Sequence, residues 1–179
     1  MPREIKNRFI LVLLNEEHYI NHLHKILLSV KKSNNRICYI CLSRSYKDII
    51  NDLKKNDIDI KFFFFVDALS SHYEKPKYQR NCIFLESPSN LDSIKKAIET
   101  TIEKEKCNVL LIDTISALLI YQGIFSILKF TNSLKTEKKE KKVEKIFIAL
   151  KKDSIPEREN KELLSDLKMF ADKTLDLTN

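Results

Sequence analysis

Glycine is almost absent from this sequence, which has only one, Gly123, in 179 residues. A Walker A loop needs two glycines followed by Lys and Ser or Thr, and a dinucleotide-binding fingerprint needs three glycines. In both motifs, backbone without a Cβ lets N–H groups crowd around a phosphate. Because neither motif exists here, we expect no ATP or GTP hydrolysis by P-loop chemistry, no catalytic residues of that kind and no cofactor.

Linkers and targeting segments are missing as well. No stretch is rich in Pro, Gly or Ser, and no internal repeat is present, so residues 1–179 are predicted to form a single domain with its own core. The apolar run Phe9–Leu14 is too short for a signal peptide, and the longest apolar tract, Val109–Phe130, contains Asp113. These features predict a cytoplasmic protein with reduced cysteines and no membrane partner.

The charge balance is basic, with a formal net charge of +7 and a pI near 9.1. Such a balance is typical of proteins that bind nucleic acid or anionic membranes. Much of the lysine alternates with Glu, as in residues 135–145, and this mixture favours a solvated surface. A basic nucleic-acid-binding accessory protein is kept as an alternative function, although no recognition motif accompanies the lysines. The groups that would form its basic stripe are Lys31/Lys32, Lys54/Lys55, Lys138–Lys142 and Lys151/Lys152.

Short runs that are apolar on both faces alternate with segments of helical periodicity. Strands buried on both faces are typical of a parallel sheet that helices cover on both sides. We therefore predict an α/β fold, a three-layer α/β/α sandwich with a mostly parallel sheet. The predicted strands are Phe9–Leu14, Ile37–Leu42, Ile60–Val66, Cys82–Leu85, Asn108–Ile112, Ile146–Leu150 and Thr174–Leu177. The predicted helices are Glu16–Lys31, Tyr46–Leu53, Ser89–Ile102 with a capping box at Ser89 and Asp92, Ser116–Leu134 and Lys161–Ala171.

The order and endings of these segments resemble the RecA/KaiC-like ATPase core, of archaeal type, over nearly the whole chain. NVLLIDTIS, residues Asn108–Ser116, is similar to the Walker B strand of that family, in which a hydrophobic strand ends in an acid. FFFFVDALS, residues Phe62–Ser70, resembles the family's strand with a terminal Asp. The segment Glu86–Ile98 resembles the linker and helix that follow, and the ending ADKTLDLTN resembles the closing strand. The resemblance implies a RecA-like sheet.

The departures from that family concern the phosphate site. The family's first strand feeds a glycine-rich loop ending in Lys and Ser or Thr, whereas this chain continues with Asn15, Glu16 and Glu17, whose carboxylates would repel a triphosphate. The family's second strand ends with a Glu that activates water, and no acid follows the second strand here. Asp113 is retained, but an acid that held Mg²⁺ has nothing to hold without phosphates. The resemblance thus implies a degenerate, non-hydrolysing member that has lost the Walker A motif.

The candidate ligand crevice lies at the carboxyl ends of the strands, where ligands of open α/β sheets bind. Its residues carry both signs of charge. They form either a ligand site or a remnant in which acids and bases neutralise one another. The crevice residues are Asn15, Glu16, Glu17, Arg44, Asp67, Asp113, Thr114 and Lys151.

A receiver-like phosphoacceptor signalling domain is a second alternative, because four of these positions follow its order. Glu16/Glu17 follow the first strand, Asp67 the third, Thr114 the fourth and Lys151 the fifth. In such a site the acids bind Mg²⁺, the Asp accepts the phosphoryl group and the Lys neutralises it. The length of the chain, the extra strands and the use of Glu for the acidic pair argue against this alternative.

The predicted helix Ser116–Leu134 is more apolar than a single sheet-facing stripe requires. It therefore needs a second partner, inside the domain or on another chain. The candidate interface residues are Leu119, Ile120, Ile124, Ile127 and Phe130. We expect a protein partner, either a second copy or a related ATPase-like subunit, and hence a non-catalytic regulatory or protein-interaction module.

The histidines predict no metal site. His18 and His22 share one helical face, which is a spacing that a zinc pair can use. His24 lies on another side of the helix, and no nearby Cys or acid completes a ligand set. We expect all three side chains to face solvent.

The cysteines and phenylalanines of the second and third strands are predicted to be core residues. Cys38 and Cys41 form a CYIC motif whose side chains point to opposite faces of a strand, so they share neither a metal nor a disulfide. Phe62–Phe65 alternate through a strand that both helical layers cover, which favours a core role over a base-stacking platform.

Overall fold

The computed structural model describes residues 8–136, 142–151 and 156–179. Helices separate most consecutive strands along the chain, as expected of an α/β protein, but the third and fourth strands are joined by a segment with only a 3₁₀ turn, Ser70–His72. The strands are β1 Phe9–Leu14, β2 Ile37–Cys41, β3 Phe63–Asp67, β4 Cys82–Phe84, β5 Val109–Asp113, β6 Glu144–Leu150 and β7 Lys173–Asp176. The helices are α1 Tyr19–Lys31, α2 Tyr46–Lys55, α3 Leu91–Glu105, α4 Ile124–Thr136 and α5 Glu157–Phe170.

One seven-stranded sheet forms the middle layer, with the strand order β4-β3-β2-β5-β6-β1-β7. Every pair of neighbouring strands is parallel. The first strand of the chain lies between two of the last, because Phe9 pairs in register with Lys145 on β6 and Ile10 with Lys173 on β7. All residues of β1, β2 and β5 are buried, as expected for parallel strands covered on both faces.

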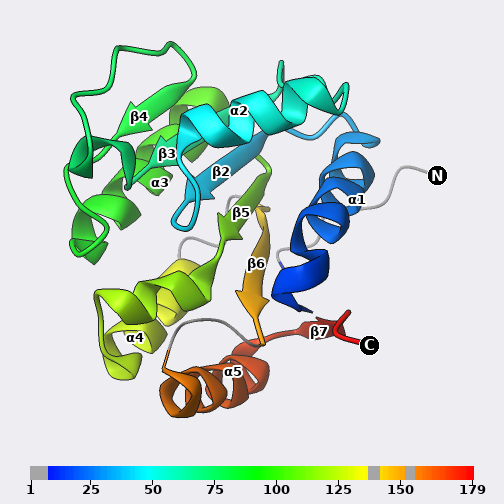
Figure 1. Cartoon of the computed structure of the whole chain (residues 1–179), viewed down its shortest axis with the longest axis vertical. Helices are drawn as coiled ribbons and strands as arrows, with labels where there is room; N and C mark the ends of the chain where they lie inside the picture. Colours follow the sequence, from blue (N-terminus) through cyan, green and yellow to red (C-terminus); the bar gives the residue numbers. More distant parts are fainter. Residues whose placement is uncertain (1–7, 137–141, 152–155) are drawn as a thin grey trace.

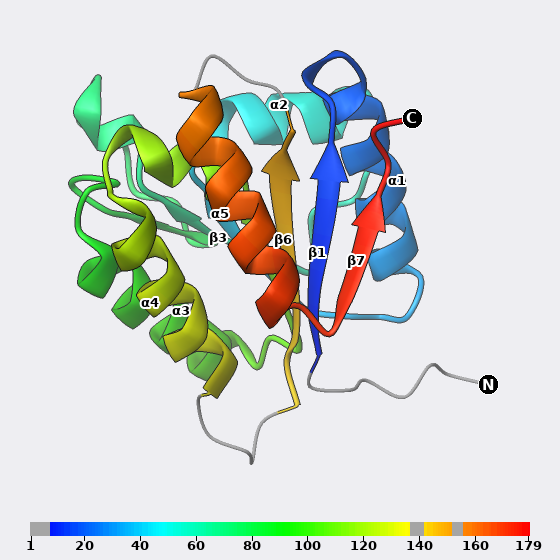
Figure 2. The ribbon, with the colours of Figure 1, turned by 90° about the horizontal axis from the view of Figure 1, so that it is seen from below.

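Helices cover both faces of the sheet, and Figures 1 and 2 show α1 and α2 on one side and α3, α4 and α5 on the other. The core accordingly falls into two clusters, one against each helical layer. Leu23 of α1 and Ile49 of α2 belong to one cluster, whereas Ile98 of α3 and Leu163 of α5 belong to the other. The predicted three-layer α/β/α sandwich with a parallel sheet is confirmed.

The single long helix predicted for Ser116–Leu134 is wrong. The chain instead forms a 3₁₀ helix over Ile115–Ile120 and begins α4 only at Ile124, after Gly123. The apolar residues of this region belong to two separate helices of different type. A period of 3.6 residues therefore does not predict which of them share a face. A cap was also misassigned, because Asn90, not Ser89, accepts the Ser93 amide 3.0 Å away at the start of α3.

Helix ends in this protein use left-handed residues other than glycine. The φ angles of Asn34, Asp57 and Lys106 are 53°, 53° and 52°, and these residues follow the ends of α1, α2 and α3. Glycine is the usual residue in this conformation because it has no Cβ to clash with the next carbonyl. The near absence of glycine thus places ordinary side chains in a strained region of the backbone.

Within the described residues, no helix is both long and apolar enough to cross a membrane. Two parts of the lysine stripe considered for nucleic acid, Lys138–Lys141 and Lys152, lie outside the described residues. Lys31, Lys32, Lys54 and Lys55 lie at or just beyond the carboxyl ends of α1 and α2.

Candidate functional site

The carboxyl ends of the strands lie along one edge of the sheet, because all seven strands run in the same direction. At this edge, β2 leads into α2 on one face, whereas its neighbour β5 leads towards α4 on the other face. Such a change of side opens a crevice, which is where ligands of open α/β sheets bind. Asp113, the last residue of β5, lies at this point.

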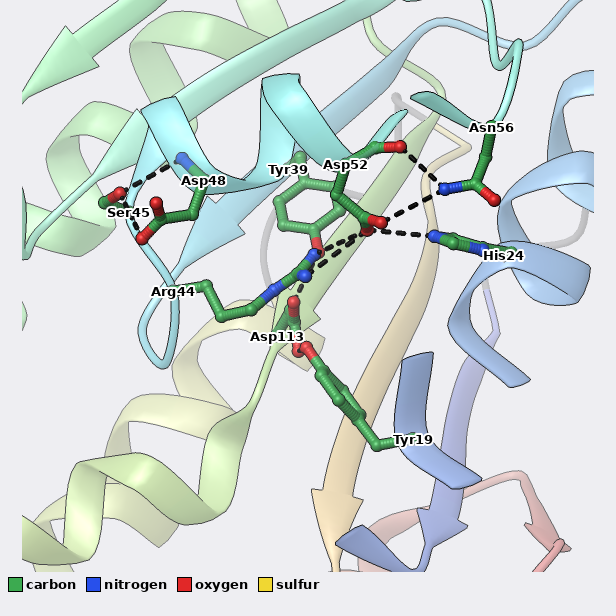
Figure 3. A network of polar contacts seen from close by, with 9 residues as sticks. All are labelled: Tyr19, His24, Tyr39, Arg44, Ser45, Asp48, Asp52, Asn56 and Asp113. Atoms are coloured by element: carbon green, nitrogen blue, oxygen red, sulfur yellow. Dashed lines mark hydrogen bonds and ion pairs between the residues drawn. The ribbon is translucent and has the colours of Figure 1, made fainter. Parts of the chain in front are cut away.

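Side chains of the protein itself fill the space around Asp113, as Figure 3 shows. The carboxylate is fully buried and accepts hydrogen bonds from the hydroxyls of Tyr19, in the first turn of α1, and Tyr39, on β2. The backbone carbonyl of Asp113 accepts the Leu42 amide at 2.9 Å and the Ser43 amide at 3.2 Å. The peptide bond between Asp113 and Thr114 is cis. Both carboxylate oxygens are thus committed to tyrosine hydroxyls.

Arg44 covers this buried acid from the loop after β2. Its guanidinium lies over the Tyr19 ring, with Cζ 5.8 Å from the ring centroid. Nη1 and Nη2 donate to Oδ2 of Asp52 at 3.3 and 3.2 Å, and Nε2 of His24 lies 2.9 Å from the same oxygen. His24 is thus a half-buried partner of Asp52, and its predicted exposure to solvent is wrong. We call Tyr19, Tyr39, Arg44 and Asp113 the tyrosine plug.

Burial dominates the electrostatics of the plug. It raises the pKa of Asp113 above its usual value, although the two tyrosine hydrogen bonds and the charge of Arg44 oppose this rise. Burial and the neighbouring Asp113 charge raise the pKa values of Tyr19 and Tyr39 well above 10. Burial also pushes the pKa of Asp52 upwards, but His24 and Arg44 outweigh it, and the net shift is downwards. Both phenols therefore stay protonated as donors at neutral pH.

The end of β1 has no loop in which a phosphate could rest. One residue, Asn15, separates the strand from a 3₁₀ turn over Glu16–His18, and α1 starts immediately afterwards. The side-chain Nδ2 of Asn15 donates to the backbone carbonyl of Thr178 at 2.6 Å, so residues near the carboxyl terminus cover this end of the strand. Glu16 and Glu17 are exposed to solvent.

Asp67 has a structural role at the end of β3. Its buried carboxylate accepts the amides of Tyr46, Leu69 and Ser70 at 2.7, 2.7 and 2.9 Å and also the Ser70 hydroxyl. These four bonds fix the start of α2 and the loop that leaves β3. No carboxylate oxygen is presented to a phosphoryl donor.

The remaining crevice residues are dispersed along the edge. Lys151 forms an ion pair with Asp176 at 3.6 Å, and the buried Thr114 accepts a hydrogen bond from Ser116 at 3.3 Å. Two strands separate β3 from β6, so the ends that carry Asp67 and Lys151 are about 14 Å apart at the usual spacing of strands. The structure does not bring together the acids, Asp, Thr and Lys of the receiver-like alternative.

The candidate interface divides between core and surface. Ile127 and Phe130 are buried, and Leu119 and Ile124 pack partly against the same core cluster. Ile120 is 64% exposed. Of the five residues predicted for the interface, Ile120 alone is largely exposed, and it lies next to two exposed residues that were not in that set, Tyr121 and Phe125.

The tyrosine plug does not show in the apolar pattern of the sequence. By its apolar pattern alone, Tyr19 is a core-facing position of the predicted helix Glu16–Lys31, and Tyr39 is one residue of the predicted strand Ile37–Leu42. A buried tyrosine hydroxyl needs a hydrogen-bond partner. That requirement, together with a single acid at the end of the neighbouring strand β5, is a signal from which a hydrogen bond between Tyr39 and Asp113 could have been predicted.

The remaining clusters are structural. Cys38 and Cys41 lie in different core clusters, as predicted from their alternation, and the four described cysteines are buried and free. Phe63 and Phe65 belong to the core, as predicted. In the described part of the chain, no three His, Cys, Asp or Glu side chains are grouped closely enough to hold a metal ion.

Comparison with known proteins shows what this fold resembles. A KaiC-like protein from the hyperthermophilic archaeon Pyrococcus horikoshii OT3 superposes with a TM-score of 0.65 at 14% sequence identity, over 97% of this chain and 74% of that one. No protein-family model and no curated protein sequence matches the chain. At this identity, the likeness shows the fold alone. The predicted RecA/KaiC-like fold is confirmed.

Proposed function

We propose that this chain is a non-catalytic regulatory or protein-interaction module built on a RecA/KaiC-like scaffold. The observation that carries the proposal is the tyrosine plug. Asp113 ends the strand that resembles a Walker B strand, and the hydroxyls of Tyr19 and Tyr39 occupy its carboxylate. A metal-binding acid must offer carboxylate oxygens to the ion. Here the same oxygens accept protein donors inside a closed core.

The end of β1 supports the same proposal. Phosphate binding at a strand–helix junction needs several backbone N–H groups that converge on one point. With only Asn15 between β1 and the next turn, and with its side chain held by Thr178, the chain offers no such nest there. The exposed carboxylates of Glu16 and Glu17 add like charge where a triphosphate would lie.

The proposed contact surface is the exposed apolar group Ile120, Tyr121 and Phe125, which we call the Ile120–Phe125 surface. These side chains are 64, 36 and 79% exposed at the junction between the 3₁₀ helix and α4. Exposed apolar groups that lie close together in a chain are a common feature of protein–protein interfaces. The partner is a second copy of this chain or a related ATPase-like subunit.

Calorimetry with ATP and Mg²⁺ tests the non-catalytic part of the proposal. We expect no measurable heat of binding and no release of phosphate. The Tyr19→Phe and Tyr39→Phe variants, which remove one donor each, are expected to behave in the same way. Tight, magnesium-dependent uptake of ATP by the unaltered chain would end the proposal.

The Phe125→Glu variant tests the contact surface. Met169 on α5 provides a matched control, because it is 83% exposed and lies outside the Ile120–Phe125 surface. We expect Phe125→Glu to abolish self-association in analytical ultracentrifugation, or binding of a purified ATPase-like subunit, whereas Met169→Glu leaves both unchanged. A chain that is monomeric at high concentration and binds no such subunit would contradict the proposal.

A further inference from the structure

Basic side chains gather at the amino-terminal edge of the sheet, opposite the edge that holds the tyrosine plug. The helices named above all end at this edge, because each leads from the carboxyl end of one parallel strand to the amino end of another. Figure 2 shows the ends of α4 and α5 on the same side as the start of β1. The last turn of each helix contains a basic residue. These residues are Lys31, Lys54 with Lys55, Lys104, Lys135 and Lys168.

The strands are entered through basic residues as well. Cations in the last turn of a helix complement its macrodipole, which is a sufficient structural reason for the lysines at the helix ends. That reason does not apply to residues that lie outside the helices, at the start of a strand. The residues at the strand starts are Arg8 before β1, Arg36 before β2, Lys61 before β3, Lys106 before β5, Lys142 before β6 and Lys173, which begins β7. We call these six residues the basic row.

The members of the basic row lie side by side. The first residues of β3, β2, β5 and β6 pair with one another in register, and Phe9 of β1 pairs with Lys145 of β6. The strand starts are therefore at one level of the sheet. With about 4.8 Å between neighbouring strands, the basic row is about 24 Å long from β3 to β7.

Acidic partners neutralise only part of this edge. Arg8 pairs with Glu144 at 3.3 Å, and Arg36 pairs with Glu105 at 3.7 Å. Several other lysines of the edge are exposed and form no ion pair within the part of the chain that the structure describes. They are Lys32, Lys54, Lys55, Lys61, Lys106 and Lys173.

The opposite edge has acids in the corresponding places. Glu16 and Glu17 lie in the turn before α1, Asp48 lies in the first turn of α2, and Asp92 lies in the first turn of α3. The formal charge of +7 is thus unevenly distributed, with its excess of cations at the amino-terminal edge.

The shape of the edge limits which polyanion can contact it. Neighbouring strands rotate by about 20–25°, so the basic row turns through about 100° between β3 and β7. A flat membrane or a straight duplex meets only part of such a row, whereas a flexible single strand can follow it. Membrane binding also uses an apolar helix face. Here the exposed apolar residues near the helix ends, Leu28 and Met169, belong to helices on opposite faces of the sheet.

An exposed aromatic ring lies at the β4 side of the same edge. Tyr78 is 87% exposed and lines a small depression together with Lys104, in the last turn of α3. Nucleobases stack on exposed aromatic side chains of proteins that bind single strands. An acidic peptide has no base to stack on the ring.

We propose that the amino-terminal edge binds single-stranded nucleic acid. Its phosphates contact the basic row and the lysines at the ends of α1 and α2, and one base stacks on Tyr78. Binding is independent of sequence, because the edge offers charges and a ring rather than groups that read base edges. The inference goes beyond the proposed protein-interaction function and does not depend on the Ile120–Phe125 surface.

Fluorescence anisotropy with a labelled strand of twenty thymidines tests the proposal. Each phosphate contact of a single strand contributes about −0.7 to the slope of log affinity against log salt concentration. About four contacts are expected from the exposed lysines, so the slope should be about −3. No binding at low salt, or a slope near zero, overturns the proposal.

Competitors identify the kind of polyanion. We expect a duplex of the same length, polyglutamate and vesicles that contain phosphatidylserine to displace the strand poorly when each is supplied at the same concentration of negative charge. Displacement by any of them as effective as that by the unlabelled strand overturns the assignment to single-stranded nucleic acid.

Paired substitutions locate the contact. Lys32→Gln combined with Lys55→Gln, at the ends of α1 and α2, should reduce the steepness of the salt slope by about 1.4. Lys25→Gln combined with Lys47→Gln changes the net charge equally on the same helices but away from the edge, and should leave the slope unchanged. Equal effects of the two pairs overturn the proposal.

The basic row has its own test. Lys61→Gln combined with Lys173→Gln removes exposed cations from its two ends. The slope should again become less steep by about 1.4, because one strand contacts both ends. An unchanged slope overturns the role of the row.

Two tyrosines of one loop test the stacking. Tyr78→Ser should weaken binding about fivefold or more, with the salt slope unchanged. Tyr73→Ser, at a ring that is 80% exposed and lies after the 3₁₀ turn Ser70–His72, should have no effect. Unchanged binding by Tyr78→Ser overturns the stacking contact. Phe125→Glu should leave oligonucleotide binding nearly unchanged, so failure here with an intact Phe125 effect removes this inference alone.

Discussion

Tyr39 on β2 donates its hydroxyl hydrogen to the carboxylate of Asp113 on the neighbouring strand β5, and both residues are fully buried. A side chain of β2 thereby occupies the carboxylate of the acid that ends β5. The Tyr39→Phe variant removes this donor and leaves a buried carboxylate with one bond fewer. We expect the free energy of unfolding to fall by about 1.5–3 kcal/mol, measured by urea denaturation. Tyr73→Phe, at a side chain that is 80% exposed, should change it by less than about 0.5 kcal/mol. Equal effects of the two substitutions would contradict the importance of the plug.

Alkaline pH should destabilise the protein through the same tyrosines. Unfolded tyrosines ionise near pH 10, whereas the native pKa values of Tyr19 and Tyr39 lie well above it. The unfolded state therefore loses these protons first. The resulting stabilisation is fully present below about pH 10 and falls above it, by up to about 1.4 kcal/mol per pH unit for each tyrosine.

Absorbance at 295 nm distinguishes this effect from ionisation of the buried cysteines, whose pKa values are also raised by burial. The native protein should ionise fewer than its six tyrosines before it unfolds. Tyr19→Phe and Tyr39→Phe should leave the native titration unchanged and make stability less dependent on pH above 10. Six phenolates formed in the folded protein would refute this prediction.

Asp67→Ala should be strongly destabilising, because three backbone amides and one hydroxyl lose their acceptor. We expect the free energy of unfolding, measured by urea denaturation, to fall by about 3 kcal/mol or more, since buried unsatisfied donors cost about 1–3 kcal/mol each. Asp48→Ala, at an exposed acid in the first turn of α2, should lower it by about 1 kcal/mol or less.

Incubation of the unaltered protein with acetyl phosphate and Mg²⁺ should leave its intact mass unchanged. A gain of one phosphoryl group that Asp67→Ala abolishes would reinstate the receiver-like alternative.

Lys106→Gly should stabilise the protein. Lys106 ends α3 in the left-handed conformation, which costs a residue with a Cβ about 1 kcal/mol relative to glycine. We expect the free energy of unfolding to rise by about 0.5–1 kcal/mol. Lys104→Gly, two residues earlier inside the same helix, should lower it by about 1 kcal/mol. The same sign for both substitutions would contradict the conformational argument.

The fold was largely accessible from the sequence, because buried strands such as those ending at Leu14 and Asp113 carry a clear apolar signal. The prediction of one helix over Ser116–Leu134 was wrong because the pattern of apolar residues does not show where the backbone changes its helical type or turns. It does not report that Ile115–Ile120 wind as a 3₁₀ helix before the chain turns at Gly123. The roles of the site residues depended on partners far away in sequence. Asp67 and Asp113 were both placed correctly at strand ends, but the donors that occupy them come from other elements, and a linear pattern does not show which donor meets which acid.

The position of β1 between β6 and β7 also affects how the protein is made. β1 is synthesised before β2–β7 and has no neighbour in the sheet until residues 144–150 have been made, because Phe9 pairs with Lys145. Meanwhile β2, β3, β4 and β5 can already associate with one another. Contacts between distant parts of a chain form slowly, and an unpaired apolar strand is prone to aggregate. In a nascent chain, FILVLL at residues 9–14 is therefore an apolar segment that needs protection by a chaperone. During refolding, we expect the amides of β1 to become protected from hydrogen exchange later than those of β2–β5.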